Sequence, residues 1–241
     1  MTTPSALRDA PHLPPPPHLF RLVVPPMILP VFLASADGTV VATALPAIAA
    51  TFGEVQNLSW VVIANLIAST VAAPAYGRLG DAFGRKRMMI IALYIFMAAS
   101  GLCAFAPSFG LLLCARVLQG LGGGGLMTLS TALVGEHVPP RQRGTYQGYL
   151  SANIVAGTTI GPVMGGFLTQ AWGWHAVFLA YLPVGLLALL LLSRLPAGTR
   201  SRVKAGFDVF GVVLLTGFVV PLLLLVSQLQ KPDRDAAPRL V

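Results

Sequence analysis

Residues 77–87 read Gly-Arg-Leu-Gly-Asp-Ala-Phe-Gly-Arg-Lys-Arg and connect two long apolar runs, at 58–79 and 88–106. Each run is long enough to cross the ~30 Å hydrocarbon core of a bilayer as a helix. Basic residues gathered in so short a connection are typical of the cytoplasmic side of a membrane. The stretch therefore predicts two membrane-spanning helices joined by a tight, basic turn.

Five further apolar runs of comparable length occur along the chain, at residues 23–50, 109–134, 146–169, 175–193 and 209–228. Of the 241 residues, 55% are hydrophobic and 10% are charged, whereas a soluble domain carries roughly 25% charged residues. The runs do not alternate between apolar and polar residues as the strands of a membrane β-barrel do. The sequence therefore predicts an all-α polytopic membrane protein.

The basic residues also predict an orientation. Twelve of the 16 Lys and Arg residues precede the first run or follow every second run, and the connections between the others contain none. The positive-inside rule then places the amino terminus in the cytoplasm. The three tryptophans fall at the opposite ends of the runs, where indole rings are favoured. The net charge of +8 thus reflects topology, and we expect the lipid bilayer as partner and no nucleic acid.

Two ionisable residues fall inside predicted spans. Asp37 lies near the middle of the first, and Arg116 lies in the fourth, where helical spacing places Gln119, Gly120 and Gly123 on its face. A charge at the bilayer centre costs about 2.5 to 3.5 kcal/mol on insertion scales, so both should face the bundle interior. Their scarcity predicts that they pair. The alternative for Asp37 is a neutral acid that bonds only to backbone.

Small residues mark the fifth span, in which residues 157–166 read Gly-Thr-Thr-Ile-Gly-Pro-Val-Met-Gly-Gly. Glycine at every fourth position lets two helices approach closely, and the proline kinks the helix. Taken alone, this spacing favours generic helix packing. The glycines at 122–125 form no phosphate loop, because the Lys-Ser/Thr that such a loop needs is absent.

Three of these segments together resemble the major facilitator superfamily. The string formed by Gly77, Gly80, Asp81, Gly84, Arg85, Lys86 and Arg87 is similar to the signature loop of that family. The string formed by Gly157, Gly161, Pro162, Gly165 and Gly166 resembles the antiporter motif of its proton-driven drug exporters. Residues 37–46 and 172–178 resemble its fourteen-helix drug:proton antiporter branch.

The resemblance covers roughly residues 25–228 and implies two six-helix bundles, each made of two inverted three-helix repeats, that rock about a central site. It implies that Asp37 and Arg116 serve proton coupling, that 77–87 is a conformational latch and that 157–166 favours export. The proton gradient would be the energy source, with no cofactor. We expect the substrate cavity to be lined by Gln119, Met127, Tyr149 and Asn153.

We expect five segments: a disordered Pro-rich cytoplasmic tail (1–21), the amino-terminal six-helix bundle (22–195), a basic linker (196–207), a seventh transmembrane helix (208–229) and an outer tail (230–241). The resemblance calls for a second bundle. We therefore expect this chain to be an amino-terminal half that requires the carboxy-terminal half, or a partner chain, to enclose a small-molecule substrate.

Two functions remain open. The first is proton-coupled efflux of drugs or other small molecules across the cell membrane, in a bacterium the inner membrane. The second is a non-transporting membrane module, or a truncated product, that assembles with another membrane protein. A membrane enzyme is disfavoured, because all four histidines lie at or beyond span ends and the two cysteines lie in apolar runs without ligand spacing. No catalytic or metal site is predicted.

Overall fold

The computed structural model describes residues 17–195 and the isolated positions Gly217 and Pro221. The regular elements within 17–195 are all helical: α1 (Pro17–Phe52), α2 (Ser59–Phe83), α3 (Arg85–Ala104), α4 (Phe109–His137), α5 (Arg143–Trp172), α6 (Trp174–Leu179) and α7 (Tyr181–Ser193). Two short 3-10 turns, η2 (Val55–Asn57) and η3 (Pro140–Gln142), precede α2 and α5. The predicted all-α class is confirmed.

Helix α1 begins at Pro17, earlier than the boundary expected at residue 22. Proline suits this position, because the first residues of a helix have no intrahelical acceptor for their N–H groups. Residues 1–16 of the expected tail lie outside the described residues. So do the expected linker, the expected outer tail and, apart from Gly217 and Pro221, the expected seventh helix.

Five segments of the described chain are long and apolar enough to cross a membrane: Val24–Phe52, Val55–Phe83, Arg85–Ala104, Phe109–His137 and Trp174–Ser193. Helix α5 is not among them, although its 30 residues would extend over about 45 Å. Its sequence is rich in glycine and threonine, which lowers its hydropathy. The fifth predicted span is therefore a long helix whose sequence is more polar than its neighbours'.

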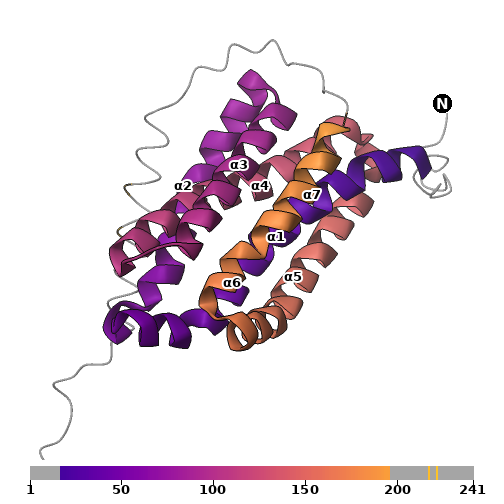
Figure 1. The fold of residues 1–241 in the computed structure, drawn as a ribbon. Helices are drawn as coiled ribbons and strands as arrows, with labels where there is room; N and C mark the ends of the chain where they lie inside the picture. The colour runs from indigo at the N-terminus through magenta and orange to yellow at the C-terminus, as the bar shows by residue number, and fades with distance from the viewer. Residues whose placement is uncertain (1–16, 196–216, 218–220, 222–241) are drawn as a thin grey trace, which may run out of the picture.

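The helices form two groups (Figure 1). Helices α2 and α3 pack on α4, whereas α5 and α7 pack on α1. Helix α1 meets α4 between the groups, and α3 contacts α6 and α7. The close pairing of α1 with α5 is matched by that of α4 with α2. This is the pairing expected of two inverted three-helix repeats in which α6 and α7 together make the last helix.

The last span is interrupted at Ala180, between α6 and α7. Pro183 explains the break, because proline has no N–H to donate to the carbonyl of Leu179 and its ring crowds that carbonyl. The interruption places Tyr181 at the start of α7, where its side chain is buried.

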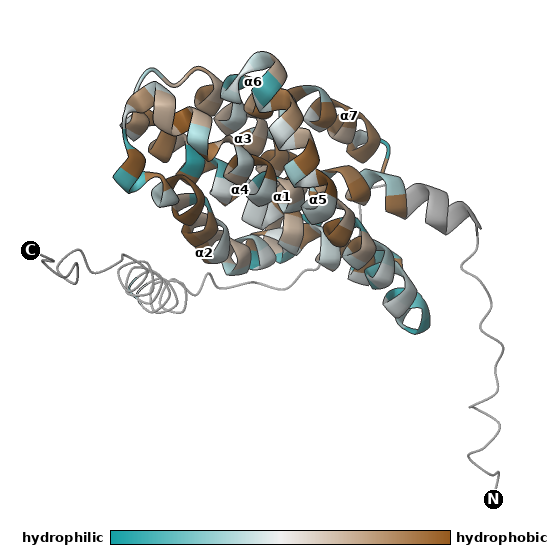
Figure 2. Ribbon diagram, turned by 90° about the horizontal axis from the view of Figure 1, so that it is seen from below, coloured by the Kyte–Doolittle hydropathy of each residue, from teal (hydrophilic) through white to brown (hydrophobic). Residues whose placement is uncertain are grey.

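Polarity is distributed as in a protein surrounded by lipid. Figure 2 shows apolar residues over the outer faces of α2 and α7. Large apolar side chains that are exposed include Leu66, Val163, Phe167 and Leu187. Among the described residues, the buried polar or charged ones are Asp37, Ser100, Arg116, Gln119 and Ser130. A soluble domain almost never buries unpaired charges. The bundle therefore buries a small polar cluster in its interior and exposes apolar side chains on its outer surface.

Glycines set the closest helix contacts. On α4, a methyl group added at Gly120 or Gly124 would overlap the backbone of α2 at Asn65 or Ser69. On α5, the glycines at every fourth position face hydroxyl side chains of α1, with Gly157, Gly161 and Gly165 against Ser35, Thr39 and Thr43. Close backbone approach of this kind is how helices pack in membranes. The run at 122–125, for which we proposed no role, is thus a packing element.

Candidate functional site

Asp37 of α1 and Arg116 of α4 form a buried ion pair. The Arg116 guanidinium donates through Nη1 to both oxygens of the Asp37 carboxylate, at 2.9 Å to Oδ1 and 2.8 Å to Oδ2. Asp37 is 2% exposed and Arg116 is fully buried. The contact predicted from scarcity is present, and it joins the two helix groups at the centre of the bundle.

Gln119 lies one turn after Arg116 on α4 and bonds to both partners. Its Oε1 accepts from Arg116 Nη1 at 2.7 Å, and its Nε2 donates to Asp37 Oδ1 at 3.2 Å. The same Nε2 donates to the hydroxyl of Ser100 on α3 at 2.9 Å. Gln119 thereby fixes the orientation of the ion pair and ties it to α3.

The hydrogen bonds of Arg116 are unevenly distributed. Nη1 faces three acceptors with only two hydrogens, while Nε donates to the carbonyl of Val61 on α2 at 2.9 Å. Nη2 is buried without a hydrogen-bond partner. The pair therefore lacks the two parallel bonds of a fork-to-fork arginine–carboxylate contact. A small rotation of the guanidinium would redistribute its bonds.

A pair so deeply buried does little for net stability, because the loss of hydration of both charges offsets most of their attraction. Removing one partner alone is costly, since the other charge is left uncompensated. Such an arrangement responds strongly to any event that neutralises one member. Protonation of the carboxylate is the simplest such event.

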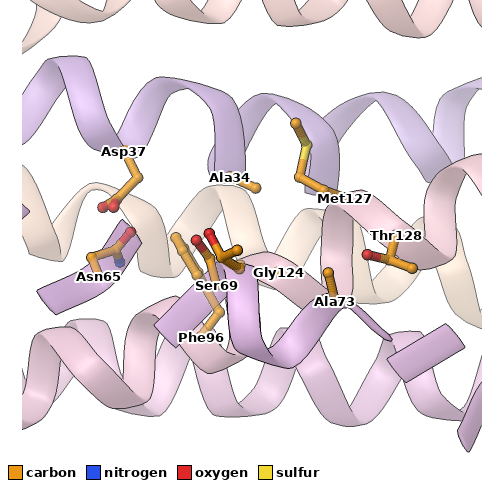
Figure 3. A pocket seen from close by; sticks show the side chains of 11 residues that line it. Ala34, Asp37, Asn65, Ser69, Ala73, Phe96, Gly124, Met127 and Thr128 are labelled. Carbon is orange, nitrogen blue, oxygen red and sulfur yellow. The ribbon is translucent and has the colours of Figure 1, made fainter. Parts of the chain in front are cut away.

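A cavity of about 290 Å³ opens beside the pair, close to the lower end of the range for small-molecule pockets. It lies among α1, α2, α3 and α4 and is lined by Ala34, Asp37, Asn65, Ser69, Thr70, Ala73, Phe96, Gly123, Gly124, Met127 and Thr128. Figure 3 shows the carboxylate of Asp37 and the amide of Asn65 at one end of the cavity and Thr128 at the other. Its polar lining is largely hydroxyl and amide groups.

Four residues were expected to line a substrate cavity, and of these Met127 lines the cavity described above. Gln119 is instead fully buried in the network around the ion pair. Asn153 donates to the carbonyl of Ile28 at 2.8 Å and so links α5 to α1. Tyr149 is 42% exposed on α5, with its ring edge-on to Tyr146. None of these last three lines the cavity described above.

Sequence reasoning missed the contribution of α2 to this cavity, made by Asn65, Ser69, Thr70 and Ala73. A signal was available, since Asn65 and Ser69 are polar residues one helical turn apart inside an apolar run. Uncharged polar residues are common enough in membrane helices that this spacing alone does not mark a cavity.

The connection at 77–87 turns sharply between α2 and α3. Gly84 has φ +97°, a backbone conformation that L-residues rarely adopt. At Gly80 an added methyl group would lie 2.7 Å from Leu129 of α4, and Gly77 faces Thr128 of the same helix. These glycines let the end of α2 lie directly against α4.

Arg85 joins this connection to the end of α4. Its guanidinium donates to Asp81 Oδ1 at 2.8 Å and 3.2 Å, and through Nη1 to the carbonyl of Ala132 at 2.6 Å. From the other side, Arg143 donates to the carbonyl of Gly135 at 2.6 Å. Both cations lie where the helix dipole of α4 is negative.

Lys86 makes a similar contact with the end of α7. Its ammonium group donates to the carbonyl of Ser193 at 2.9 Å and to that of Leu195. Arg87 is exposed. The basic connection thus bonds to the carboxy-terminal ends of two helices, one from each helix group, while part of its charge stays on the surface.

The five residues on α5 that resemble an antiporter motif, within 157–166, lie in different surroundings. Gly157, Gly161 and Gly165 are buried against α1. Pro162 and Gly166 lie on other faces of the helix, where Gly166 has open space beside it. No group of three or more His, Cys, Asp or Glu side chains within the described part of the chain could hold a metal ion.

Comparison with known proteins identifies the family. The sequence model of the Major Facilitator Superfamily matches residues 27–231. The chain belongs to this superfamily. Among solved structures, the xylose transporter XylE from E. coli is similar, with a TM-score of 0.69 at 19% identity, over 87% of this chain and 58% of that one. The human organic anion transporter MFSD10 gives a TM-score of 0.68 at 21% identity, over 88% of this chain and 55% of that one.

The relatives found by sequence have names that are more specific than the name of the superfamily. The chain is 35% identical over 206 residues to Multidrug transporter protein MdtP of Bacillus subtilis (strain 168). It is 36% identical over 214 residues to Efflux pump FUS6 of Gibberella fujikuroi. Each match covers 86% of this chain but only 38% and 39% of the respective relative. The chain therefore spans well under half the length of these transporters.

Proposed function

We propose that this superfamily bundle is the amino-terminal half of a proton-coupled efflux antiporter for drugs or other small molecules. The observation that carries the proposal is the buried Asp37–Arg116 pair at the edge of a cavity that is lined in part by hydroxyl and amide groups. Relatives named as a multidrug transporter and an efflux pump support the direction and the substrate class.

The pair offers a simple coupling step. A proton added to a carboxylate oxygen of Asp37 neutralises that group and removes its attraction for Arg116. The guanidinium keeps its charge and turns to other acceptors, such as Gln119 Oε1. Because the pair joins α1 to α4, its loosening would let the two three-helix repeats shift. Return of the proton to solvent would restore the pair.

The ends of the bundle support the orientation that we propose. Arg85, Lys86 and Arg143 bond to helix carbonyls at one end. At the other end, the indole of Trp174 donates to the hydroxyl of Thr51 at 3.0 Å. We therefore place the basic end and the amino terminus in the cytoplasm, with the bundle in the cell membrane, which in a bacterium is the inner membrane.

Transport also requires a second bundle, since alternating access needs two bodies that move about a shared site. We propose that the cavity beside Asp37 forms part of one wall of that site. The 77–87 connection would act as a latch and the α5 string would favour export. The partner of the bundle is then a carboxy-terminal half or a second chain.

The test is Asp37→Asn in the complete transporter, assayed in inverted membrane vesicles energised by a proton gradient. The amide keeps the shape of the side chain but carries no titratable proton, so gradient-driven substrate accumulation should be lost while membrane insertion is retained. Glu54→Gln serves as the control, because Glu54 lies outside the buried pair and its carboxylate accepts from Asn57. Full coupled accumulation by Asp37→Asn would refute the proposal.

A further inference from the structure

Tyr181 of α7 is a further polar residue at the buried pair. It is 5% exposed, and its ring packs on Phe96 with the ring centroids 5.7 Å apart. Phe96 itself lines the cavity with Asp37. The tyrosine hydroxyl lies near enough to the Asp37 carboxylate to interact with it, but its geometry falls short of a hydrogen bond.

The hydroxyl is a buried donor without an acceptor, like Arg116 Nη2. A buried polar group without a partner is unfavourable and calls for an explanation. The Asp37 carboxylate has capacity to spare, because it accepts three hydrogen bonds and an ionised carboxylate offers about four acceptor sites. A donor and a free acceptor site therefore lie close together without being joined.

We infer that Tyr181 is a positioning residue for Asp37, whose hydroxyl donates to the carboxylate when Arg116 moves away. This inference rests on the proposed proton-coupling role of Asp37. The hydroxyl would hold the carboxylate in place after it has lost its proton and before Arg116 returns to it. The break at Ala180 matters here, because it sets where α7 begins and so where the hydroxyl lies.

The groups whose charges act on the Tyr181 hydroxyl come from three helices: Asp37 of α1, Arg116 of α4 and the thiol of Cys103 on α3. Cys103 is itself buried, and its sulfur lies 3.7 Å from Gln119 Oε1. Helix α6, which also packs on α7, contributes no charged group to this contact. Asp37 is thus the natural acceptor for the hydroxyl.

The test compares Tyr181→Phe with the unaltered protein by infrared difference spectroscopy. The full 241-residue chain is reconstituted in lipid nanodiscs, and protonation of Asp37 is followed through its carboxyl C=O band, assigned with Asp37→Asn. Phenylalanine keeps the ring on Phe96 and removes only the hydroxyl. Losing a donor to the ionised form should raise the pH midpoint by about one unit, a tenfold change in proton affinity. Tyr94→Phe is the matched control, because Tyr94 is 59% exposed on α3.

A second substitution guards against failure of the first. With 3-fluorotyrosine at position 181, the hydroxyl becomes a stronger donor, so the midpoint should fall. A midpoint unchanged by both substitutions, with the Asp37 band present, overturns the role of Tyr181 and leaves the coupling role of Asp37 standing. Absence of any band that Asp37→Asn removes means that Asp37 exchanges no proton, which overturns both.

Discussion

At the scale of single residues, the bundle contains two buried charges, and separating them would cost free energy because each would be left without its partner. The carboxylate of Asp37 receives three hydrogen bonds, two from Arg116 and one from Gln119. Each charge is tolerated only because the other is present. An exposed pair such as Asp81 with Arg85, in which Asp81 is 48% exposed, is a different case, because solvent screens it and its net contribution is about 0 to 1 kcal/mol.

This contrast predicts how the pair responds to substitution. Asp37→Leu should destabilise the bundle by about 3 to 5 kcal/mol, because Arg116 is left buried and unpaired. The double variant Asp37→Leu/Arg116→Met should recover most of that loss, since neither charge then remains. Denaturant unfolding of the reconstituted protein measures both, with Asp81→Asn as the exposed control. Losses that simply add in the double variant would mean that the two charges do not stabilise each other.

At the scale of helices, the sequence was informative about what packs but less about where. The glycine spacing on α5 predicted a close contact, yet only the structure shows that α1 and its hydroxyl residues supply the other surface. The run on α4 makes contacts of the same kind, with Gly122 against the backbone of α3 and Gly124 against that of α2, and sequence reasoning set it aside after finding no phosphate loop. Spacing predicts a smooth helix face, but the partner helix depends on the whole arrangement of the chain.

The same limit applies to the cavity and the span boundaries. Asp37 and Arg116 could be paired from sequence because they are the ionisable residues within span interiors. Uncharged residues such as Asn65 carry no comparable signal, so the α2 wall was missed. Helix α5 was predicted from its length and composition. The break at Ala180 follows from Pro183 but was not foreseen, because the run 175–193 is apolar between its two end residues.

The α4 contact with α2 can be tested within one helix. Gly124→Ala should destabilise the bundle by about 1 to 3 kcal/mol, because the new methyl group overlaps the backbone of Ser69 and the helices must separate. Gly135→Ala on the same helix has open space beside it and should be neutral or slightly stabilising. Thermal unfolding in detergent measures the difference. Equal midpoints for the two variants would show that the close approach is not needed for stability.

At the scale of the whole molecule, the bundle has two chemically different ends. One is held by cations on helix carbonyls, including Arg85 on α4 and Lys86 on α7. The other carries the tryptophans, with Trp174 bonded across to α1. Because these contacts link segments far apart in sequence, both ends are properties of the folded bundle and not of single loops. By the positive-inside rule, we expect the basic end to face the cytoplasm.

This polarity predicts which side of the membrane each loop faces. Gln56 is exposed in the turn before α2, and Thr145 is exposed at the start of α5, at the opposite end of the bundle.

The experiment uses single cysteines at these two positions in a chain carrying Cys114→Ala, because Cys114 is exposed whereas Cys103 is buried. In intact cells, a membrane-impermeant maleimide should label Gln56→Cys, and it should label Thr145→Cys only after the membrane is opened. The chain with Cys114→Ala and no added cysteine sets the background. Labelling of both sites in intact cells, or of neither, would contradict the alternation of the spans, and labelling of Thr145→Cys alone would reverse the orientation.

The alternation of the spans requires that α5 cross the bilayer despite its lower hydropathy. If α5 did not cross, the residues after it would lie on the cytoplasmic side. A third cysteine at Trp172, which is 67% exposed, tests that point: it should label in intact cells as Gln56→Cys does.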